Sequence, residues 1–392
     1  MAKRRIGVFT GSRSEYGLLV PVLQAISEAP DLELVLIAGG SHVQSEADGF
    51  VAAAKVPVER ADERAGSTSR AIGAGVTAIA DALEDLRIDA FVIYGDRFEA
   101  FAAMIASTQM GIPTAHIEGG DLTQGGALDD VVRHAMTKLA HVHLTTNADA
   151  AERVRLLGEE PWRIYNVGFP TIDLIKAGDY VAAEDVGADL GLDAGRPVVL
   201  FTQHPITTSP DKANAQINAS LAALERAREE LGAQLILTYP NGDLGSDAII
   251  AALKDFASER AGVVLRQSLG RRLYHGTLNL CGRVATGVCV GNSSSGVKET
   301  MAFDCPAVDI GPRQTGRLRG MNVAHVPHEA EAIYHAIAHA VEDQSYRSAI
   351  KAAENPYGKG NTGPKIAEIL THIDLRAPEL LPKQTLLPAS AV

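Results

Sequence analysis

The sequence predicts an α/β protein made of two doubly wound domains, each with a parallel sheet covered by helices on both faces. Three observations support this fold class. Short β-branched and aliphatic runs alternate with longer helical patterns, which is typical of parallel sheets. The alternation pauses at residues 176–196, a stretch rich in Gly, Ala and Asp, and then restarts. A chain of 392 residues also suits two domains better than one.

The strands and helices follow from these patterns in chain order. We expect strands at residues 5–10, 32–38, 90–94, 114–117, 141–145 and 163–167, and, after the pause, at 197–202, 234–238, 263–267, 284–290 and 307–310. Apolar residues at helical spacing predict helices at 18–27, 77–86, 131–139, 213–230 and 329–341. We therefore expect an N-terminal domain over residues 1–175, a C-terminal domain over 176–370 and a proline-rich tail over 371–392.

Composition and charge restrict the partners. The formal net charge of −12 disfavours binding to nucleic acid or to an anionic membrane, so a phosphate-bearing ligand needs a local cationic pocket. The three cysteines, Cys281, Cys289 and Cys305, lack CxxC spacing, which indicates free thiols in a reducing compartment. The sequence has no apolar run of membrane-spanning length and no signal-peptide pattern at its start. We expect a cytoplasmic protein.

The first candidate site segment is the sequence TGSRSEYG at residues 10–17, between a strand and a helix. Ligands of open parallel sheets bind at the carboxyl ends of the strands. Small residues admit a phosphate, the helix N-terminus favours an anion, and Arg13 can add a charge-assisted hydrogen bond. The segment is neither GxGxxG nor a Walker loop, which disfavours a dehydrogenase or a kinase. The alternative is a plain tight turn with a solvated arginine.

Carboxylates gather after the next strands. Asp96 follows the strand at 90–94, Glu118 follows the strand at 114–117, and Asp129 and Asp130 open a helix. Like charges held close together raise one pKa, which suits a general acid or base near neutrality. The alternatives are helix capping for the three aspartates. Asp130 and His134 have i, i+4 spacing, which is more often a surface ion pair than a metal site, so we expect no metal.

Further polar loops lie in the second half. His204 follows the strand at 197–202. The serine turn, GNSSSG at residues 291–296, can donate hydrogen bonds to phosphate oxygens. Glu299 would be repelled by a phosphate and therefore suits ribose hydroxyls, while Arg313 lies in an arginine-rich, glycine-flanked loop. The alternatives are a serine turn without a ligand and an ordinary surface loop.

The order and spacing of these motifs carry a family resemblance. The series GSRSEYG, YGDRFEA, HIEGGD, GALDDVVRHAMTKLAHVH, QHPITT, YPNGDLGS, GNSSSGVKE and GPRQTGR resembles the hydrolysing UDP-N-acetylglucosamine 2-epimerases of sialic- and legionaminic-acid-type pathways, over residues 4 to about 326. The resemblance implies two Rossmann-like domains facing a cleft (GT-B architecture), a nucleotide-sugar substrate, no cofactor, and a homodimer or homotetramer. Non-hydrolysing relatives carry Gln-His-Arg where this chain has GSHV at residues 40–43, which favours the hydrolysing branch.

The resemblance also assigns residue roles. The implied catalytic set is Asp96, Glu118, Asp129, Asp130 and His204, and the implied substrate and nucleotide contacts are Arg13, Arg133, Ser293, Ser294, Ser295, Glu299 and Arg313. The implied reaction is an anti-elimination of nucleoside diphosphate to a glycal, followed by addition of water with inversion at C2. Uridine or guanosine, and N-acetylglucosamine or a 2,4-diacetamido-6-deoxy sugar, both remain open. The alternatives are a GT-B glycosyltransferase and a non-catalytic sugar-nucleotide sensor.

Overall fold

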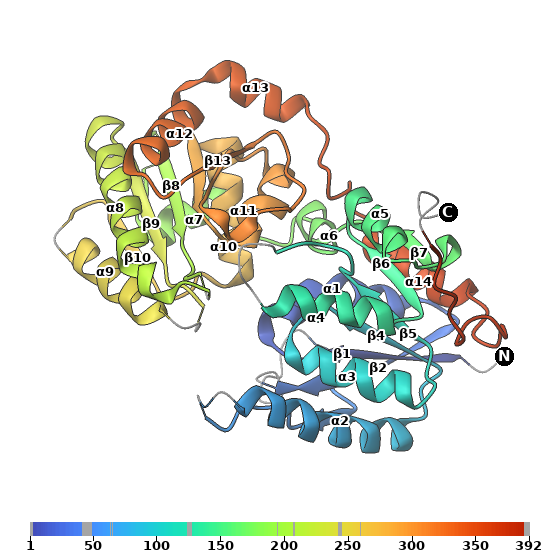
Figure 1. The fold of residues 1–392 in the computed structure, drawn as a ribbon. Helices are drawn as coiled ribbons and strands as arrows, with labels where there is room; N and C mark the ends of the chain where they lie inside the picture. The colour runs from blue at the N-terminus through green and yellow to red at the C-terminus, as the bar shows by residue number, and fades with distance from the viewer. Residues whose placement is uncertain are drawn as a thin grey trace. The chain divides into compact units, whose positions relative to one another are not determined.

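The computed structural model describes residues 3–40, 49–62, 64, 66–123, 128–193, 195–206, 208–241, 245–258 and 260–387, without the side chains of Arg13, Ser14 and Leu128. The chain forms two compact α/β units (Figure 1). Unit 1 comprises Met1–Asp121, Leu128–Asp173 and Tyr357–Val392, and unit 2 comprises Leu122–Ala127 and Leu174–Pro356. The end of the chain thus belongs with unit 1, and the boundaries expected at residues 175 and 370 stay a prediction.

Unit 1 is built on a seven-stranded parallel sheet with the order β3-β2-β1-β4-β5-β6-β7. Its strands are β1 Arg4–Thr10, β2 Leu32–Gly39, β3 Ala54–Val56, β4 Ala90–Tyr94, β5 Thr114–Ile117, β6 Val142–Thr145 and β7 Ile164–Asn166. Every residue of β4, β5 and β6 is buried, as expected for strands covered on both faces. The strand order reverses between β1 and β4, so loops with ligand-binding potential follow these strands.

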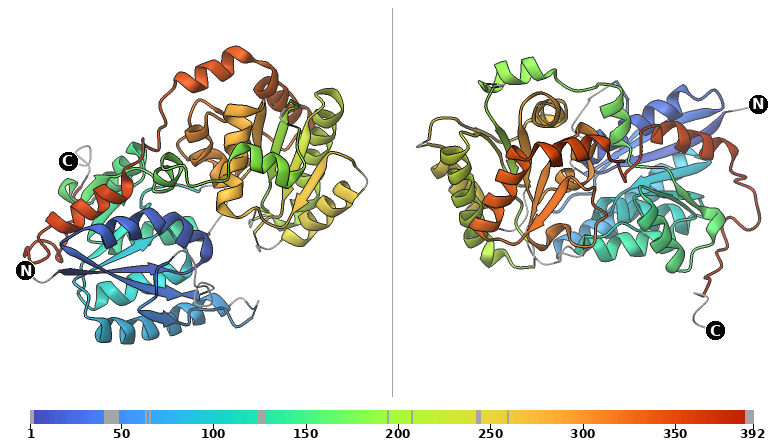
Figure 2. Two further views of the ribbon diagram at one scale, coloured as in Figure 1. Left: turned by 180° about the vertical axis from the view of Figure 1, so that it is seen from behind. Right: turned by 90° about the horizontal axis from the view of Figure 1, so that it is seen from above.

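The helices of unit 1 are α1 Arg13–Glu28, α2 Ser67–Leu86, α3 Phe98–Gln109, α4 Leu128–Leu139, α5 Ala148–Leu156 and α14 Thr362–His372, and α6 Thr171–Lys176 begins in this unit. In α2 every fourth residue from Ser67 to Leu83 is buried, so one helix face packs on the core. The last helix, α14, runs alongside α1 (Figure 2). A Cβ at Gly363 would lie 2.3 Å from the Pro21 carbonyl oxygen, so this close approach requires glycine.

The segment after α14 is bonded to unit 1. The buried Arg163 guanidinium donates to the carbonyl oxygens of Leu380 (2.6 Å) and Pro382 (3.1 Å). The ammonium of Lys383 caps the end of α4 at the Ala140 carbonyl (2.7 Å) and forms an ion pair with the buried Glu159 (2.7 Å). Residues 380–383 therefore form a strap, here called the C-terminal strap, that holds the end of α4.

Unit 2 is built on a six-stranded parallel sheet with the order β10-β9-β8-β11-β12-β13. Its strands are β8 Val198–Thr202, β9 Gln234–Thr238, β10 Val263–Arg266, β11 Gly287–Gly291, β12 Ala307–Ile310 and β13 Val323–Val326. All eleven strands expected in the chain occur, but β11 begins at residue 287 rather than 284. Leu280–Val284 instead forms a π-helical turn, whose Cys281 carbonyl accepts a hydrogen bond from Arg347 (2.9 Å). The strands β3 and β13 were not expected.

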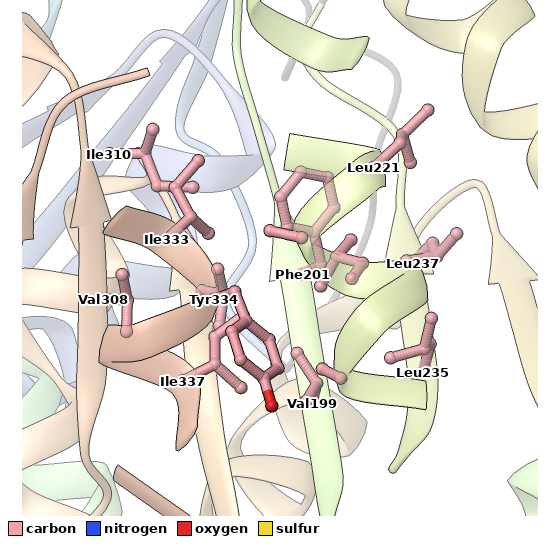
Figure 3. Close-up of a cluster of buried hydrophobic side chains, with 14 of the residues drawn as sticks. Val199, Phe201, Leu221, Leu235, Leu237, Val308, Ile310, Ile333, Tyr334 and Ile337 are labelled. Atoms are coloured by element: carbon pink, nitrogen blue, oxygen red, sulfur yellow. The ribbon is translucent and has the colours of Figure 1, made fainter. Parts of the chain in front are cut away.

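The core of unit 2 packs between its sheet and three of its helices. The helices that lie wholly in this unit are α7 Ala183–Leu190, α8 Ala213–Glu230, α9 Ser246–Ser258, α10 Gly270–Asn279, α11 Ser294–Lys298, α12 Ala330–Glu342 and α13 Gln344–Ala352. Figure 3 shows Phe201 of β8 and Leu237 of β9 near Leu221 of α8, with Ile333 and Ile337 of α12 on the β12 side. Each such buried side chain contributes about 1.5–3 kcal/mol of transfer free energy. No helix in the described part of the chain is both long enough and apolar enough to span a bilayer.

Candidate active site

Two carboxylates follow neighbouring strands of unit 1. Glu118 comes directly after β5, and Asp96 comes two residues after β4. Tyr94, the last residue of β4, pairs with Ile117 in the sheet, and its hydroxyl donates a hydrogen bond to Glu118 Oε2. Burial and the Glu118 carboxylate raise the pKa of Tyr94 well above its ordinary value, so the hydroxyl stays protonated and remains a donor. Adjacent parallel strands thus bring these groups to one edge of the sheet.

The backbone of Glu118 is in a conformation that is rare for its residue type. Its φ angle is +71°, in the left-handed region, and the residue is only 6% exposed. Such a conformation costs on the order of 1–3 kcal/mol and persists where the surroundings impose it, often at functional sites. The Glu118 N–H donates to the Leu144 carbonyl (3.1 Å), which fixes the turn to β6. The strand end therefore holds this carboxylate in one place.

Arg133 organises the carboxylates from α4. Its guanidinium forms an ion pair with Asp96, donates to Asp130 Oδ1 (3.2 Å) and donates to the Asp121 carbonyl (3.0 Å). Burial alone lowers the pKa of Arg133, but Asp96, Asp121 and the other carboxylates outweigh it, so the pKa is raised and the group stays charged. Arg133 is 2% exposed. The structure therefore uses it to hold Asp96 and Asp130 together, and its contact with a substrate stays a prediction.

The other expected site residues of α4 are more accessible than Arg133. Asp129 lies in the first turn and is exposed, whereas Asp130 is half-buried, with its Oδ2 3.8 Å from His134 Nε2. Burial lowers the pKa of His134, although Asp130 opposes that shift. Within the described ranges, no three His, Cys, Asp or Glu side chains are grouped so that they would hold a metal ion. Because its lowered pKa leaves His134 mainly neutral near pH 7, Asp130 and His134 are close neighbours on the helix rather than an ion pair.

His116, the strand residue two positions before Glu118, was not expected from the sequence as a site residue. Its Nε2 lies 2.7 Å from the carbonyl oxygen of Gly95, the residue before Asp96. Burial lowers the pKa of His116 to about 4, so the ring is neutral near pH 7 and Nε2 carries the proton it donates. His116 thus fixes the backbone that presents Asp96. A polar residue inside an otherwise apolar strand was the available signal.

The turn before α1, which contains Gly11 and Ser12, is closed by hydrogen bonds to Glu15 of that helix. Ser12 is the N-cap of α1, and its hydroxyl accepts a hydrogen bond from the Glu15 N–H (3.3 Å). Glu15 Oε2 accepts from the Gly11 N–H (2.9 Å). Burial and the neighbouring Glu99 carboxylate raise the pKa of Glu15 to about 8, although Arg97 lowers it. The side chain of Arg13, the expected phosphate contact of this turn, lies outside the described residues.

The serine turn of unit 2 lies between β11 and α11. Gly291 has a φ of +135°, and a Cβ there would lie 1.8 Å from the Thr202 carbonyl oxygen, so only glycine lets β11 approach β8 so closely. Ser293 is the N-cap of α11, and Ser293, Ser294 and Ser295 are all partly exposed. The cavity that Ser293 and Thr202 help to line has a volume of about 10 Å³, which admits no more than one water. A larger ligand must therefore bind on the exposed side of the turn.

Asn292 ties this turn to two other expected site residues. Its side chain accepts from the His204 N–H (2.6 Å) and donates to the His204 carbonyl (2.8 Å). Its carbonyl oxygen accepts from Arg313 (3.0 Å) and from the side chain of Gln314 (2.8 Å). The serine turn, His204 and Arg313 are thus assembled at the ends of β8, β11 and β12. Asn292 and Gln314 were not selected from the sequence, where both read as ordinary loop residues.

His204 is held by one neighbouring residue. Its Nδ1 lies 3.0 Å from the Asn241 backbone nitrogen and 3.1 Å from the Asn241 side-chain oxygen. Burial and the nearby Arg313 guanidinium lower the pKa of His204 to about 3. The ring is therefore neutral near pH 7.

Glu299 lies at the end of α11 with one oxygen already engaged. Its Oε2 accepts from Ser295 Oγ (2.6 Å) and from His275 Nε2 (3.1 Å). Burial raises the pKa of Glu299, but the His275 and Ser295 hydrogen bonds outweigh it and the pKa is lowered. The group is therefore an ionised carboxylate. His275 was not expected from the sequence, since it lies in α10 without any recognisable motif.

Comparisons with known proteins place the chain in a family. The family model described as UDP-N-acetylglucosamine 2-epimerase matches residues 24–371. A Campylobacter jejuni protein named GDP/UDP-N,N'-diacetylbacillosamine 2-epimerase (hydrolyzing) is 31% identical over 82% of this chain and 84% of its own. A Legionella pneumophila protein named UDP-N,N'-diacetylbacillosamine 2-epimerase (hydrolyzing) is 28% identical over 95% of this chain and 97% of its own.

A solved structure has a similar fold. The UDP-GlcNAc 2-epimerase from Neisseria meningitidis, bound to UDP-GlcNAc, matches 94% of this chain and 99% of its own with a TM-score of 0.77 and 17% sequence identity. At that identity the match shows the fold, and it confirms the predicted GT-B-type class with two Rossmann-like domains. With the family model covering most of the chain, this protein belongs to the UDP-N-acetylglucosamine 2-epimerase family.

Proposed function

We propose that this protein is a hydrolysing sugar-nucleotide 2-epimerase. It would convert UDP-N-acetylglucosamine, or a UDP- or GDP-linked 2,4-diacetamido-6-deoxy relative, into the free manno-configured sugar and nucleoside diphosphate. The observation that carries the proposal is the carboxylate cluster of unit 1, in which Arg133 binds both Asp96 and Asp130 and Tyr94 binds Glu118. Nucleotide binding alone does not need such a cluster, whereas proton transfer at carbon does.

The reaction begins with removal of the C2 proton by one carboxylate while the nucleoside diphosphate leaves C1, which gives a glycal. Water then adds, with its oxygen bonding to C1 and a proton bonding to C2 on the opposite face. Asp96, Glu118, Asp129 and Asp130 share these proton transfers. The fixed positions of Glu118 and Asp96 suit this task, since a proton-transfer group must lie within hydrogen-bond distance of its carbon-bound target.

The nucleotide would be bound by unit 2, with Arg13 of unit 1 as a further diphosphate contact. The hydroxyls of the serine turn and the Arg313 guanidinium stabilise the negative charge that grows on the leaving diphosphate. His204, neutral near pH 7, is a further phosphate contact in this proposal. Glu299 accepts from ribose hydroxyls, because a carboxylate would be repelled by a phosphate. Because arginine can neutralise the diphosphate, the proposed mechanism invokes no metal or cofactor.

The names of the relatives support the hydrolysing branch and leave two sugars to test. The Campylobacter and Legionella proteins are named as hydrolysing enzymes for diacetylbacillosamine nucleotides, and the Neisseria structure holds UDP-GlcNAc. The family match is to epimerases, which disfavours the glycosyltransferase and sensor alternatives. A cytoplasmic location and a homodimeric or homotetrameric assembly belong to the same proposal.

The test is proton NMR of the purified protein with UDP-N-acetylglucosamine in deuterated water without added metal. We expect free N-acetylmannosamine with deuterium at C2, together with UDP. If this substrate is inert, the UDP- and GDP-linked 2,4-diacetamido-6-deoxy sugars are tried, and turnover of one of them identifies the substrate. Release of UDP without deuterium at C2 would contradict the elimination step, and no turnover of any of these sugars would contradict the proposed function.

The Asp129→Asn variant separates catalysis from binding. Asp129 is exposed, so the substitution should leave the fold intact. We expect turnover to be lost while the affinity for nucleoside diphosphate stays unchanged, measured by calorimetry. A parallel loss of affinity and turnover would indicate that Asp129 binds the nucleotide instead.

A further inference from the structure

The hydrogen bonds of Glu299 are unequally divided between its two oxygens. Ser295 Oγ and His275 Nε2 both donate to Oε2, at 2.6 and 3.1 Å. A carboxylate oxygen has two lone-pair sites, so these donors saturate Oε2. Among the described residues, none donates a hydrogen bond to Oε1. Any further hydroxyl that binds this carboxylate therefore binds Oε1.

His275 is a rigid donor because its helix is anchored. Arg271, one turn earlier in α10, donates to the Asp179 carbonyl (3.0 Å) and forms an ion pair with its carboxylate (2.6 Å). Directly after His275, a Cβ at Gly276 would lie 2.4 Å from the Val181 carbonyl oxygen, so α10 lies directly on that backbone. These contacts fix α10 before and after His275 in the sequence.

The imidazole itself is confined. His275 is 2% exposed, and its ring packs against Phe303, with the ring centroids 5.6 Å apart. Its Nδ1 is buried and has no hydrogen-bond partner among the described residues. A buried polar atom left unpaired costs free energy that simple packing would not justify, since an apolar side chain of similar size avoids that cost. The histidine is therefore explained by the hydrogen bond that its other nitrogen donates to Glu299.

We infer that His275 is a positioning residue for nucleotide recognition, holding Glu299 so that its Oε1 accepts hydrogen bonds from the vicinal hydroxyls of the ribose. This inference rests on the proposed function, in which unit 2 binds the nucleotide. A carboxylate fixed at one oxygen recognises hydroxyl donors with little loss of side-chain entropy, whereas a mobile one must be ordered on binding. His275 thus acts through Glu299 and does not touch the ligand.

The test compares calorimetric affinities for UDP, 2′-deoxy-UDP and 3′-deoxy-UDP, and for the matching guanosine nucleotides. In the wild type we expect at least one deoxy-nucleotide to bind about tenfold more weakly than its parent, as expected for the loss of a hydrogen bond to a charged group. His275→Leu should bring that ratio close to one. His275→Gln, whose amide can donate, should restore part of it, and it serves as the second variant if the leucine protein fails to fold.

Two controls complete the design. His339→Gln changes a histidine of the same unit that is paired with Asp343 on the surface of α12 (3.5 Å), and should leave the ratio at the wild-type value. Glu299→Gln alone and together with His275→Leu should give the same ratio, because residues that act as one unit are not additive. In turnover, His275→Leu should raise KM and leave kcat within about twofold, since the ribose lies away from the reacting carbon.

The outcomes distinguish a failure of the proposed function from a failure of the inference about His275. If the wild type binds no nucleoside diphosphate, the proposed function fails and this inference fails with it. If the wild type distinguishes ribose from deoxyribose and His275→Leu weakens both ligands equally with an unchanged ratio, the inference alone is overturned, because His275 then has only a structural role. A collapsed ratio with partial rescue by glutamine supports it.

Discussion

The Arg133 guanidinium forms an ion pair with Asp96, which joins α4 to the end of β4 at the carboxylate cluster. Arg133 also binds Asp130 (3.2 Å), so a single buried cation compensates the negative charge of two carboxylates. Removing one partner of such a buried pair leaves an uncompensated charge, which is more costly than the loss of an exposed pair. The stability of unit 1 and the geometry of the proposed acid/base groups therefore depend on the same side chain.

Replacing Arg133 by methionine should destabilise the protein by about 3–5 kcal/mol. The midpoint of urea denaturation measures this change, and turnover should be lost even under conditions where the variant is folded. The matched control is Arg155→Met, which removes an exposed i, i+3 ion pair with Glu152 and should leave the midpoint nearly unchanged. Equal changes in the urea midpoint for the two substitutions would show that the ion pairs of Arg133 stabilise the protein no more than an exposed pair does.

Replacing Tyr94 by phenylalanine should lower kcat by about tenfold or more, because the proposed acid/base group Glu118 loses a hydrogen bond to its charged form. The ring still fills its buried site, so the stability should change little. Steady-state kinetics with the substrate identified by NMR measures the effect. The control is Tyr346→Phe, which deletes a hydroxyl bonded to the Met321 carbonyl (3.3 Å) in unit 2, and its kcat should match the wild type. A wild-type kcat for Tyr94→Phe would exclude this hydrogen bond from the reaction.

The sequence predicted the sheets better than the contacts of the site. Strands such as β4 are buried on both faces and read as continuous apolar runs, whereas β3 has three residues and β13 has none that is fully buried. The positions of Asp96 and Glu118 followed from the rule that loops after parallel strands carry ligands. Their partner Arg133 could not be paired with Asp96 by spacing, since that contact depends on how α4 packs beside the sheet.

Other contacts could not be predicted from the sequence, because their residues occupy positions typical of the core. Tyr94 and His116 lie within buried strands, and only the chain fold shows that each bonds to a group at the end of the neighbouring strand. His275 lies in a helix with no motif, and its partner Glu299 is 24 positions away. Long-range side-chain pairs of this kind are set by tertiary packing, which single-sequence patterns do not encode.

Glu15 should make stability depend on pH above neutrality. Burial and Glu99 raise its pKa to about 8 from an ordinary 4.5, with Arg97 opposing and Asp96 adding to the shift. The folded protein thus keeps a proton that the unfolded chain releases, so the free energy of unfolding falls as pH rises from about 5 to 8, by on the order of 1 kcal/mol per pH unit. Glu15→Gln keeps an acceptor for the Gly11 N–H but does not titrate.

Urea denaturation between pH 6 and 9 tests this. The wild type should lose stability relative to Glu15→Gln as the pH rises, and the difference should level off above about pH 8. Glu152→Gln, at an exposed position on α5, should follow the wild type. Parallel curves for the wild type and Glu15→Gln would show that Glu15 is already ionised at pH 6.

The C-terminal strap should stabilise unit 1. Lys383→Met removes the donor that caps the Ala140 carbonyl and one of the cations around the buried Glu159, so we expect a loss of about 2–3 kcal/mol. Urea denaturation measures this loss, and limited proteolysis should cut the variant faster near its C-terminus. Lys365→Met, on the exposed face of α14, is the control and should behave as the wild type. Wild-type stability of Lys383→Met would show that the Lys383 contacts of the strap contribute nothing.

The two glycines at the ends of the serine turn, Gly291 and Gly296, provide a test variant and its matched control. Gly291 pairs with Thr202 between β11 and β8, and a Cβ there would lie 1.8 Å from the Thr202 carbonyl oxygen, whereas a Cβ at Gly296 would come no closer than 3.8 Å to the Cys289 sulfur. The first clash involves backbone on both sides and cannot be relieved by a side-chain rotation. Gly291→Ala should therefore displace the turn, while Gly296→Ala should fit.

We expect Gly291→Ala to lose at least tenfold in UDP or GDP affinity, or to unfold at a clearly lower urea concentration, whereas Gly296→Ala keeps both properties. Calorimetry and denaturation are measured on the two variants side by side. Because Gly296 lies within α11, alanine there should even favour the helix slightly. If Gly291→Ala binds nucleotide and unfolds like the wild type, the close approach of β11 to β8 does not shape the turn. If only Gly296→Ala loses affinity, the ligand approaches the turn from its helical end.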